Sequence, residues 1–380
     1  MKLETFTYTQ KSGWSVDTLP GLDSANTLVL VFGASNFLDA TAPIEHLIRQ
    51  YPQSQVMGCS TAGEIFGTVV QDDSLSVAVV QFERTRVASA STHVSSAKDS
   101  YQAGELIASQ LKAPDLVAVF VLSNGTTING SELVRALNDQ FGGQVVVTGG
   151  LAGDGDRFER TWVINDRQVT QDSVAAVGLY GDHIEVRHGS KGGWDVFGPQ
   201  RMVTRSEGNV LYELDGRPAL DLYKEYLGDL VSGLPSSALL FPLALSEDRL
   251  AQKTIVRTIL GVDEKAHSLT FAGDIPIGYY AQLMKANFDR LIDGASEAAL
   301  MAGSQTEANG PILSVAISCV GRRLVLNERT EEELEATLEA LPPGVSQVGF
   351  YSYGEISPYT SSTCDLHNQT MTLTTLREVS

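Results

Sequence analysis

The octapeptide GCSTAGEI at Gly58–Ile65 has a near copy, GFYSYGEI, at Gly349–Ile356. Each copy follows a short run containing apolar residues, QVM before the first and SQV before the second, and each ends in Gly-Glu-Ile. Two such similar stretches, far apart in one chain, indicate that a larger structural unit has been duplicated.

The sequence around each octapeptide follows one order: strand, helix, strand, glycine-containing turn, strand. Around the first copy, LVLVF at 28–32 is an apolar strand and PIEHLIRQYP at 43–52 has helical spacing, while SLSVAVVQF at 74–82 is a returning strand. The same order predicts repeat units at about 27–95, 115–188 and 311–378, and a weaker fourth unit at 220–270.

Strands joined through helices run parallel, and helices then cover at least one face of the sheet. The sequence therefore predicts an α/β protein of two related domains, built from duplicated strand-helix-strand-strand units with mixed sheets. We place an N-terminal segment at 1–24, one domain at 25–217 and a second at 218–380. The boundary follows MVTRSEGNVLYEL at 202–214, which has the pattern of a hairpin with Glu-Gly-Asn at its tip.

Charge and cysteine content exclude several classes of protein. The chain has 27 Lys and Arg against 46 Asp and Glu, a net charge of −19, which disfavours nucleic-acid and membrane-surface partners. Cys59, Cys319 and Cys364 are too scattered for a disulfide framework or a metal knuckle. Without a membrane-length apolar run or the apolar segment of a signal peptide, we expect a cytoplasmic protein.

Ligands of such sheets bind beyond the carboxyl ends of strands. GCSTAGEI, GGLAGDGD at 149–156 and GFYSYGEI all occupy that position, so we expect them to border one shared site or two related ones. The alternative is that their glycines only form tight turns. The candidate ligand-binding residues are Cys59, Thr61, Glu64, Asn124, Asp154, Tyr351, Tyr353, Glu355, His367 and Gln369.

Each candidate also has a structural interpretation. Glu64 and Glu355 follow equivalent glycines, and either carboxylate could bind a ligand amine or hold its own turn closed. Tyr351 and Tyr353 could offer flat surfaces to a ligand or lie in the core. Turn formation explains Asn124, Asp154 and Asp156 about as well as ligand binding does. His367 and Gln369 belong to a polar row that needs partners, which a ligand or a neighbouring loop could supply.

Four separated segments resemble the FIST sensory proteins, which pair an N-terminal and a C-terminal FIST domain. These segments are GCSTAGEI, VTRSEGNVLYELDGRPALDLY, GFYSYGEISP and CDLHNQTMTL, and the resemblance runs from about residue 25 to the end. It implies an intracellular ligand-binding module that signals through a separate partner, a histidine kinase or a cyclic-di-GMP enzyme. Formation of a homo-oligomer is left open.

The resemblance extends to NosP, a FIST subgroup that binds haem and reports nitric oxide. It therefore implies a haem-binding nitric oxide sensor, for which His367 is the candidate axial ligand because the axial ligand of haem is usually His, Cys or Met. The alternative is a sensor of an amino-acid-like metabolite. An enzyme using Cys59 as nucleophile is a further alternative, but no histidine lies in the equivalent loops to act as its base. We therefore expect no enzymatic activity.

Overall fold

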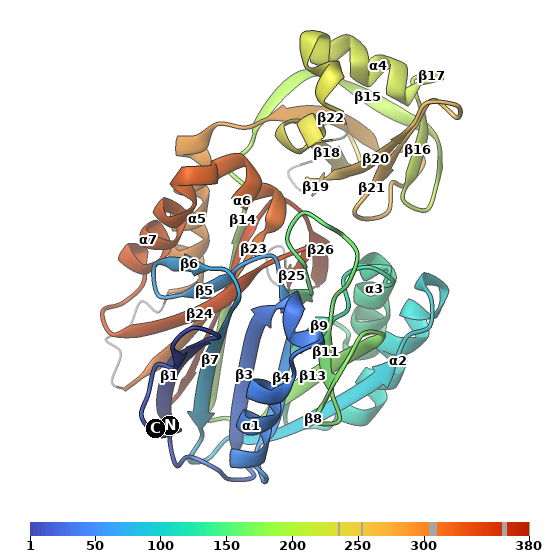
Figure 1. The fold of residues 1–380 in the computed structure, drawn as a ribbon. Coiled ribbons are helices and arrows are strands. Elements are labelled where there is room, and N and C mark those ends of the chain that lie inside the picture. The colour runs from blue at the N-terminus through green and yellow to red at the C-terminus, as the bar shows by residue number, and fades with distance from the viewer. Residues whose placement is uncertain (235, 252–253, 304–309, 359–362, 380) are drawn as a thin grey trace.

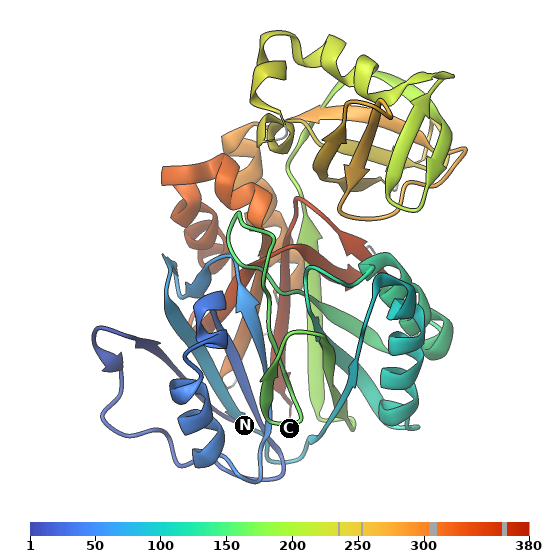
Figure 2. The ribbon, with the colours of Figure 1, turned by 45° about the vertical axis from the view of Figure 1, so that its right-hand side comes forward.

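The computed structural model describes residues 1–234, 236–251, 254–303, 310–358 and 363–379. These residues form a body and a smaller lobe, which lies above the body in Figure 1 and Figure 2. The described residues of the body form three mixed sheets covered by helices. The structure thus confirms the predicted α/β class with mixed sheets and repeated units.

The body repeats one unit, and its central strand always runs parallel to the strand after the helix. The first unit comprises β1 (Lys2–Thr9), β2 (Gly13–Trp14), β3 (Thr27–Ala34), η1 (Ser35–Leu38), α1 (Ala42–Gln50), β4 (Gln55–Thr61), β5 (Glu64–Phe66), β6 (Val69–Gln71) and β7 (Ser74–Gln81). The second comprises β8 (Arg86–His93), η2 (Ala97–Asp99), α2 (Ser100–Leu111), β9 (Leu116–Ser123), α3 (Gly130–Phe141), β10 (Val146–Leu151), β11 (Val163–Asn165), β12 (Gln168–Thr170) and β13 (Ser173–Tyr180). The third comprises β14 (Ile184–Lys191), α5 (Phe288–Ala302), β23 (Ile312–Cys319), α6 (Val320–Leu326), η5 (Asn327–Arg329), α7 (Thr330–Ala340), β24 (Val345–Ser352), β25 (Gly354–Pro358), β26 (Cys364–His367) and β27 (Met371–Glu378).

Each unit gives a hairpin to the sheet of another unit. The hairpin β5–β6 of the first unit pairs with β24 of the third, and β25–β26 of the third pairs with β10 of the second. The hairpin β11–β12 of the second unit pairs with β4 of the first, which closes the cycle. The exchange covers a strand edge in each of the three sheets of the body. Sequence periodicity could not predict it, because pairing between units leaves no local pattern.

One glycine recurs at the same point of every unit for a shared steric reason. Gly58, Gly149 and Gly349 lie in the strand that follows the helix. A Cβ atom on any of them would collide with a carbonyl oxygen of the parallel neighbouring strand. These glycines therefore permit close approach of two backbones within a sheet, whereas the alternative weighed from the sequence was a tight turn.

Alternating residues of the three central strands build one core between the sheets. Phe32 of β3 stacks on Phe350 of β24 in this core, with ring centroids 4.8 Å apart. The opposite faces of β3 and β9 pack under α1 and under α2 with α3. The central strands contribute Leu28, Leu30, Phe32, Ala118, Phe120, Leu122, Leu313, Val315 and Ile317.

Helix α3 begins at a side-chain cap, whereas no side chain caps the start of α7. Asn129 accepts hydrogen bonds from the backbone N–H groups of Ser131 and Glu132, as a cap residue does. Thr330 is instead the first residue of α7, and its hydroxyl donates to backbone carbonyl groups upstream. Glu333 is fully buried and pairs with an arginine, so it is not available to the helix terminus.

The lobe is an insertion between β14 and α5 of the third unit. Its elements are β15 (Asp195–Glu207), β16 (Val210–Leu214), β17 (Arg217–Pro218), α4 (Ala219–Leu227), η3 (Gly228–Gly233), η4 (Ser236–Leu240), β18 (Leu243–Ser246), β19 (Ile255–Arg257), β20 (Ile259–Asp263), β21 (Ser268–Phe271) and β22 (Tyr280–Lys285). The hairpin predicted at 202–214 is confirmed. A fourth unit at 220–270 is wrong, because the described strand pairs of the lobe are all antiparallel. The boundary predicted after residue 217 falls inside β17.

None of the helices within the described ranges is both long and apolar enough to cross a membrane.

Candidate functional site

Glu64 and Glu355 occupy equivalent positions and hold their own turns closed. Thr61 and Ser74 donate to the Glu64 carboxyl group, Ser74 through its backbone N–H at 3.0 Å and its hydroxyl at 2.8 Å. Around Glu355, Ser352 donates at 2.7 Å, while Thr370 donates through its N–H at 3.2 Å and its hydroxyl at 2.9 Å. In both units the carboxyl group ties the strand-end turn to the start of the returning strand.

Burial raises the pKa of both carboxyl groups to about 8, although the donors around them oppose the shift. Glu64 is 1% exposed and Glu355 is 0% exposed. Within the described ranges, the structure contains three large cavities, which are discussed below. Glu64 lies in the wall of one of them, whereas Glu355 lines none of the three. The two glutamates therefore do not border a common hollow, and of their two interpretations the geometry favours turn closure.

The second unit has a longer loop in place of this glutamate. Gly153 corresponds to Gly63 and Gly354, and residues 154–162 then extend before β11 begins. The buried carboxylate of Asp154 accepts the backbone N–H groups of Phe158 at 2.9 Å, Glu159 at 3.0 Å and Arg160 at 2.8 Å. Tyr353, from the octapeptide of the third unit, donates its hydroxyl to the same carboxylate. Asp154 and Tyr353 together fix the shape of this loop.

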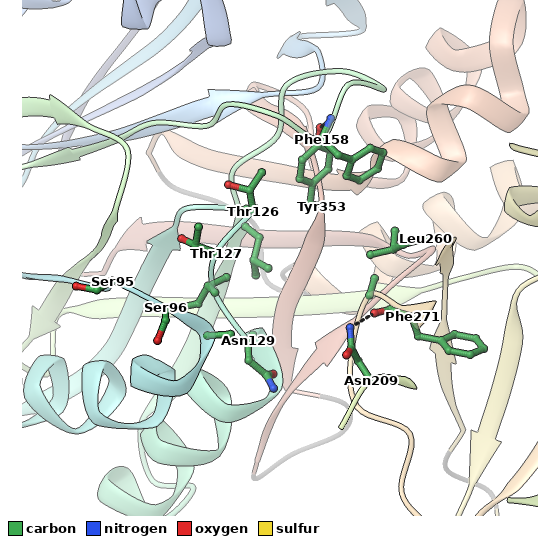
Figure 3. Close-up of a pocket in the computed structure, with 17 residues that line it drawn as sticks. Ser95, Ser96, Thr126, Thr127, Asn129, Phe158, Asn209, Leu260, Phe271 and Tyr353 are labelled. Atoms are coloured by element: carbon green, nitrogen blue, oxygen red, sulfur yellow. Dashed lines mark hydrogen bonds between the residues drawn. The ribbon is translucent and has the colours of Figure 1, made fainter. Parts of the chain in front are cut away.

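The loop presents an aromatic ring to the space between lobe and body. Phe158 has a φ of 56°, a left-handed conformation that bulky residues rarely adopt. Its ring stacks on Tyr353 with centroids 4.2 Å apart and planes 15° apart, and it remains 40% exposed. Figure 3 shows the two rings together at one end of the cavity.

This cavity, of about 500 Å³, lies between the body and the lobe. Its walls come from both parts (Figure 3): the body supplies the loop before α3, and the lobe supplies Asn209, Leu260 and Phe271. A second cavity, of about 600 Å³, shares Phe158 and Leu260 with it and is lined mainly by apolar residues of the lobe and α6. The first is lined by Ser95, Ser96, Ala97, Gly125, Thr126, Thr127, Ile128, Asn129, Gly130, Leu151, Phe158, Asn209, Leu260, Phe271, Ala272, Gly273 and Tyr353.

A third cavity, of about 630 Å³, lies on the body above the first octapeptide. It is strongly polar and carries charges of both signs. Thr61 and Glu64 lie in its wall together with Arg157, Arg323 and Asp72. Arg323 donates to both carboxylate oxygens of Asp72, at 2.9 Å and 2.7 Å, so part of this charge is already paired within the protein.

Direct polar contacts join lobe and body beside the first cavity. Arg257 of β19 is buried and donates to the backbone carbonyl group of Leu366 in β26 at 2.9 Å. Asn129, the cap of α3, donates to the Asp274 carboxylate at 3.2 Å. We call these two contacts the latch. They tie the lobe to the second sheet of the body at the edge of the cavity.

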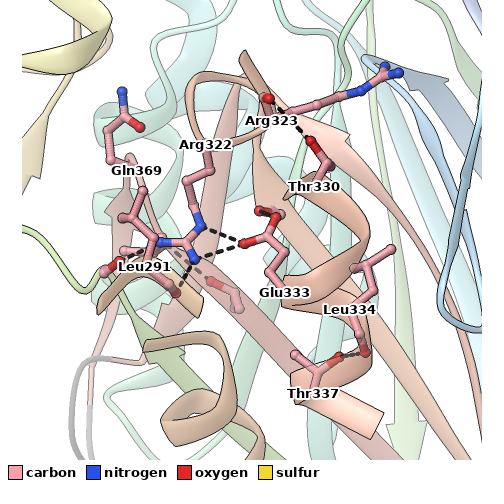
Figure 4. A network of polar contacts seen from close by, with 12 residues as sticks. Leu291, Arg322, Arg323, Thr330, Glu333, Leu334, Thr337 and Gln369 are labelled. Carbon is pink, nitrogen blue, oxygen red and sulfur yellow. Dashed lines mark hydrogen bonds and ion pairs between the residues drawn. The ribbon is translucent and has the colours of Figure 1, made fainter. Parts of the chain in front are cut away.

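A buried ion pair fixes the connections through which the chain enters and leaves the lobe (Figure 4). Arg322 and Glu333 are fully buried, and the guanidinium group donates to the carboxylate at 3.0 Å and 2.7 Å. Arg322 also donates to the carbonyl oxygens of Gly192 on the outgoing segment and Leu291 on the returning helix. We call this arrangement the hinge clamp. Tyr351 joins it by donating to Glu333 at 2.7 Å.

Several of the predicted site residues lie inside the protein, away from the large cavities. Cys59 is 0% exposed in the central core, where burial raises the pKa of its thiol well above the ordinary value, so it stays protonated and unreactive. Tyr351 is fully buried in the hinge clamp. Asn124 is buried behind the first cavity and accepts from the N–H and hydroxyl of Thr127, which shapes the loop before α3.

His367 and Gln369 also lie under the surface, at the end of the third unit. His367 is 4% exposed, and its Nε2 lies 2.9 Å from the carbonyl oxygen of Ser357. Gln369 is fully buried with a φ of 62°, and neither polar atom of its side-chain amide has a hydrogen-bond partner among the described residues. Its backbone carbonyl group accepts from the indole of Trp194, just beyond the hinge clamp.

Haem does not fit the residues present. The described linings of the three large cavities contain no His, Cys or Met to serve as an axial ligand, and the hydroxyl of Tyr353 in the first cavity already donates to Asp154. The two cavities that reach the lobe also offer no basic side chain in their described linings for the propionates. His367 lines none of the three, so a porphyrin could reach it only after the third unit had opened. Among the described residues, no cluster of His, Cys, Asp and Glu suits a metal ion.

Sequence reasoning missed Phe158, Arg257 and Arg322. A signal for Phe158 was present, because the second copy of the strand-end loop is much longer than the other two and places an aromatic residue in a polar stretch. Arg257 and Arg322 left no such signal. Their partners are backbone carbonyl groups and a glutamate brought close only by the fold.

Comparison with known proteins identifies two domain families. The FIST N domain model matches residues 27–217, and the FIST C domain model matches residues 219–358. An uncharacterized protein of Methanocaldococcus jannaschii is 22% identical over 77% of this chain and 59% of its own length. An uncharacterized protein of Mycobacterium tuberculosis is 28% identical over 60% of this chain and 59% of its own length. The chain thus spans about three fifths of the curated relatives that it matches.

The structural comparison gives a distant match. The crystal structure of a cyanuric acid hydrolase from A. caulinodans aligns with a TM-score of 0.38 and 8% identity, covering 100% of this chain and 99% of that chain.

Proposed function

Because the chain belongs to the family that joins a FIST N domain to a FIST C domain, we propose that it is a sensor whose small organic ligand binds between lobe and body. The observation that carries this proposal is the cavity of about 500 Å³ whose walls come from both parts. A molecule bound there touches the loop before α3 on one side and β20–β21 on the other. Its binding energy therefore depends on where the lobe lies.

A ligand can shift an equilibrium only by its differential affinity for the two states. Here, the state with the lobe held against the body offers both walls of the cavity, and a displaced lobe offers one. The latch lies at the edge of the same cavity, so its contacts and those of the ligand favour the same lobe position. The hinge clamp fixes the two chain segments about which the lobe would turn.

In this proposal, the position of the lobe is the signal, and a separate partner reads it. A histidine kinase or a cyclic-di-GMP enzyme is the partner that the family resemblance suggests. The absence of catalysis stays a prediction, which the buried and protonated state of Cys59 supports. Haem is not part of the proposal, since the cavity residues do not fit it.

A second candidate is a sensor of an amino-acid-like metabolite that binds in the third cavity. The observation that favours it is the presence of Arg323 and Arg157 beside carboxylates, which suits a molecule carrying an ammonium and a carboxylate group. This cavity contains no lobe residue in its described lining, so binding there would leave the lobe position unchanged.

A thermal-shift screen with a metabolite library separates these candidates. Thr126 is exposed in the wall of the first cavity, so Thr126→Trp fills the cavity without disturbing the core. Gln110→Trp, at the exposed end of α2 and outside all three cavities, is the matched control. We expect a ligand that raises the melting temperature of wild type and Gln110→Trp but not of Thr126→Trp, since ligand at about 100 times its Kd contributes about 2.7 kcal/mol.

Lobe movement is then measured between spin labels on Ser109→Cys in α2 and Lys265→Cys in the lobe. The three native cysteines are buried, so labelling of the folded protein is confined to the introduced pair. We expect the ligand to narrow the distance distribution. A ligand that stabilises Thr126→Trp as much as wild type, or that leaves the distribution unchanged, contradicts the proposal.

A further inference from the structure

Phe158 is held in a costly conformation by Asp154 and Tyr353. A non-glycine residue in the left-handed region costs on the order of 1 kcal/mol or more, and such residues gather at functional sites. Asp154 accepts three backbone N–H bonds across this loop, and Tyr353 accepts a further bond from the N–H of Phe158 at 3.1 Å. Two buried side chains thus impose the strained geometry.

As a result, the aromatic ring of Phe158 lies in the wall of the first cavity, between lobe and body. Tyr353 covers one face of the Phe158 ring, and Phe158 as a residue is still 40% exposed. The exposed part of the ring therefore belongs to the opposite face and the edges. Phe158 lines both cavities between lobe and body, and so does Leu260 of β20. A flat molecule lying on Phe158 would touch both parts of the protein.

The neutral lining of the first cavity restricts the class of ligand that can bind there. None of its 17 described lining residues carries a charged side chain. A charged ligand would lose its hydration without gaining an opposite charge in the wall, which is unfavourable. The polar groups present are neutral: hydroxyls of Ser95, Ser96, Thr126 and Thr127, and amides. Asn209 uses its amide N–H₂ on the carbonyl group of Phe271 and keeps its oxygen as an acceptor.

We propose that the cavity between lobe and body takes a planar, uncharged aromatic or heteroaromatic molecule that stacks on the free face of Phe158 and hydrogen-bonds the neutral polar wall. This inference rests on the proposed function only in taking this cavity as the ligand site. A volume of about 500 Å³ suits a fused ring system with polar substituents, in the size range of ordinary small-molecule sites.

Three matched probes test the chemical class. Naphthalene-2-carboxamide is planar and neutral, decahydronaphthalene-2-carboxamide is neutral but not planar, and naphthalene-2-carboxylate is planar but charged. Their dissociation constants for wild type, measured by ligand-observed NMR, are expected to be lowest for the planar neutral amide, by about tenfold or more. Equal binding of the non-planar amide, tightest binding of the carboxylate, or no binding of the planar amide overturns the inference.

Variants at the ring test the position. Phe158→Leu keeps an apolar side chain in the same backbone geometry but removes the flat face, so the planar amide should bind roughly two- to tenfold more weakly. Phe158→Tyr keeps the face and should bind as wild type does, which controls for effects of substitution on the loop. Phe288→Leu, on an exposed aromatic residue of α5 outside the three cavities, is the second control. Undiminished binding to Phe158→Leu overturns the inference.

The experiments can contradict the sensor mechanism and the ligand class independently of each other. Phe158-dependent binding of the planar amide without a change in the lobe–body distance supports the ligand class and contradicts the sensor mechanism. A charged or aliphatic metabolite that binds in this cavity and moves the lobe supports the sensor and overturns the ligand class.

Discussion

The equivalent glutamates predict an unusual pH dependence of stability. Glu355 is 0% exposed, and burial raises its pKa to about 8 from an ordinary value of 4.5. Between those values the unfolded chain has released a proton that the folded protein keeps, so rising pH favours unfolding. The slope is about −1.4 kcal/mol per pH unit for one group. It vanishes below about pH 4.5, where both states are protonated, and above about pH 8, where both are ionised.

Glu355→Gln replaces the protonated carboxyl group with a neutral group of the same shape and should remove this slope. As the pH rises from about 5 to about 8, the unfolding free energy of the variant should increase relative to that of wild type, by on the order of 2–4 kcal/mol in total. Urea unfolding followed by tryptophan fluorescence at several pH values measures it. Glu64→Gln should behave alike, since burial also raises the pKa of Glu64 to about 8.

The matched control is Glu339→Gln, at an exposed position near the end of α7, which should leave the pH profile of wild type unchanged. The reasoning is refuted if wild type and Glu355→Gln lose stability in parallel as the pH rises. That result would mean that the buried carboxyl group is ionised in the folded protein, held by its three donors.

Two further measurements address the hinge clamp and haem. Arg322→Met leaves the buried Glu333 without its charged partner and should cost about 3–5 kcal/mol of unfolding free energy. The double variant with Glu333→Leu should recover most of this loss, and equal losses in both would contradict a charge-based cause. After addition of hemin and desalting, absorbance spectra of wild type and His367→Ala should show the same Soret region, because His367 lies under the surface against Ser357. A Soret band that His367→Ala removes would restore haem as a ligand.

The repeat and the fold class could be predicted because local patterns carry them. In the first unit, for example, the apolar strand Leu28–Phe32 and the helical spacing of Ile44, Leu47 and Ile48 carry the pattern, and all of these residues are buried as the pattern requires. The exchange of hairpins could not be predicted, because pairing of β5 with β24 follows from the arrangement of whole units.

The candidate site was less accessible to sequence reasoning. Their polarity made Glu64, Glu355, His367 and Gln369 candidate ligand-binding residues, but in the structure each is 4% exposed or less. A polar side chain near a strand end can serve a ligand or its own backbone, and the sequence contains nothing that separates the two uses. The lobe, which supplies one wall of the cavity, was interpreted as a further repeat unit because its short apolar strands resemble those of the body.

The proposed ligand site lies where the repeat units differ from one another. Gly63, Gly153 and Gly354 are equivalent, and the residue before each is Ala62, Ala152 and Tyr353. The single tyrosine in this set reaches from the third unit to the loop of the second, where it fixes Asp154 and supports Phe158.

That loop is itself the one strand-end copy that has been lengthened, and the lobe is inserted in only one unit. Conserving the octapeptide in two units keeps the turns closed, since each buried carboxyl group satisfies donors that would otherwise be left unpaired. The lengthened loop and the inserted lobe create the first cavity, although the three units of the body otherwise exchange hairpins in the same way. A ligand site built from such departures need occur only once per chain, even though the framework around it repeats.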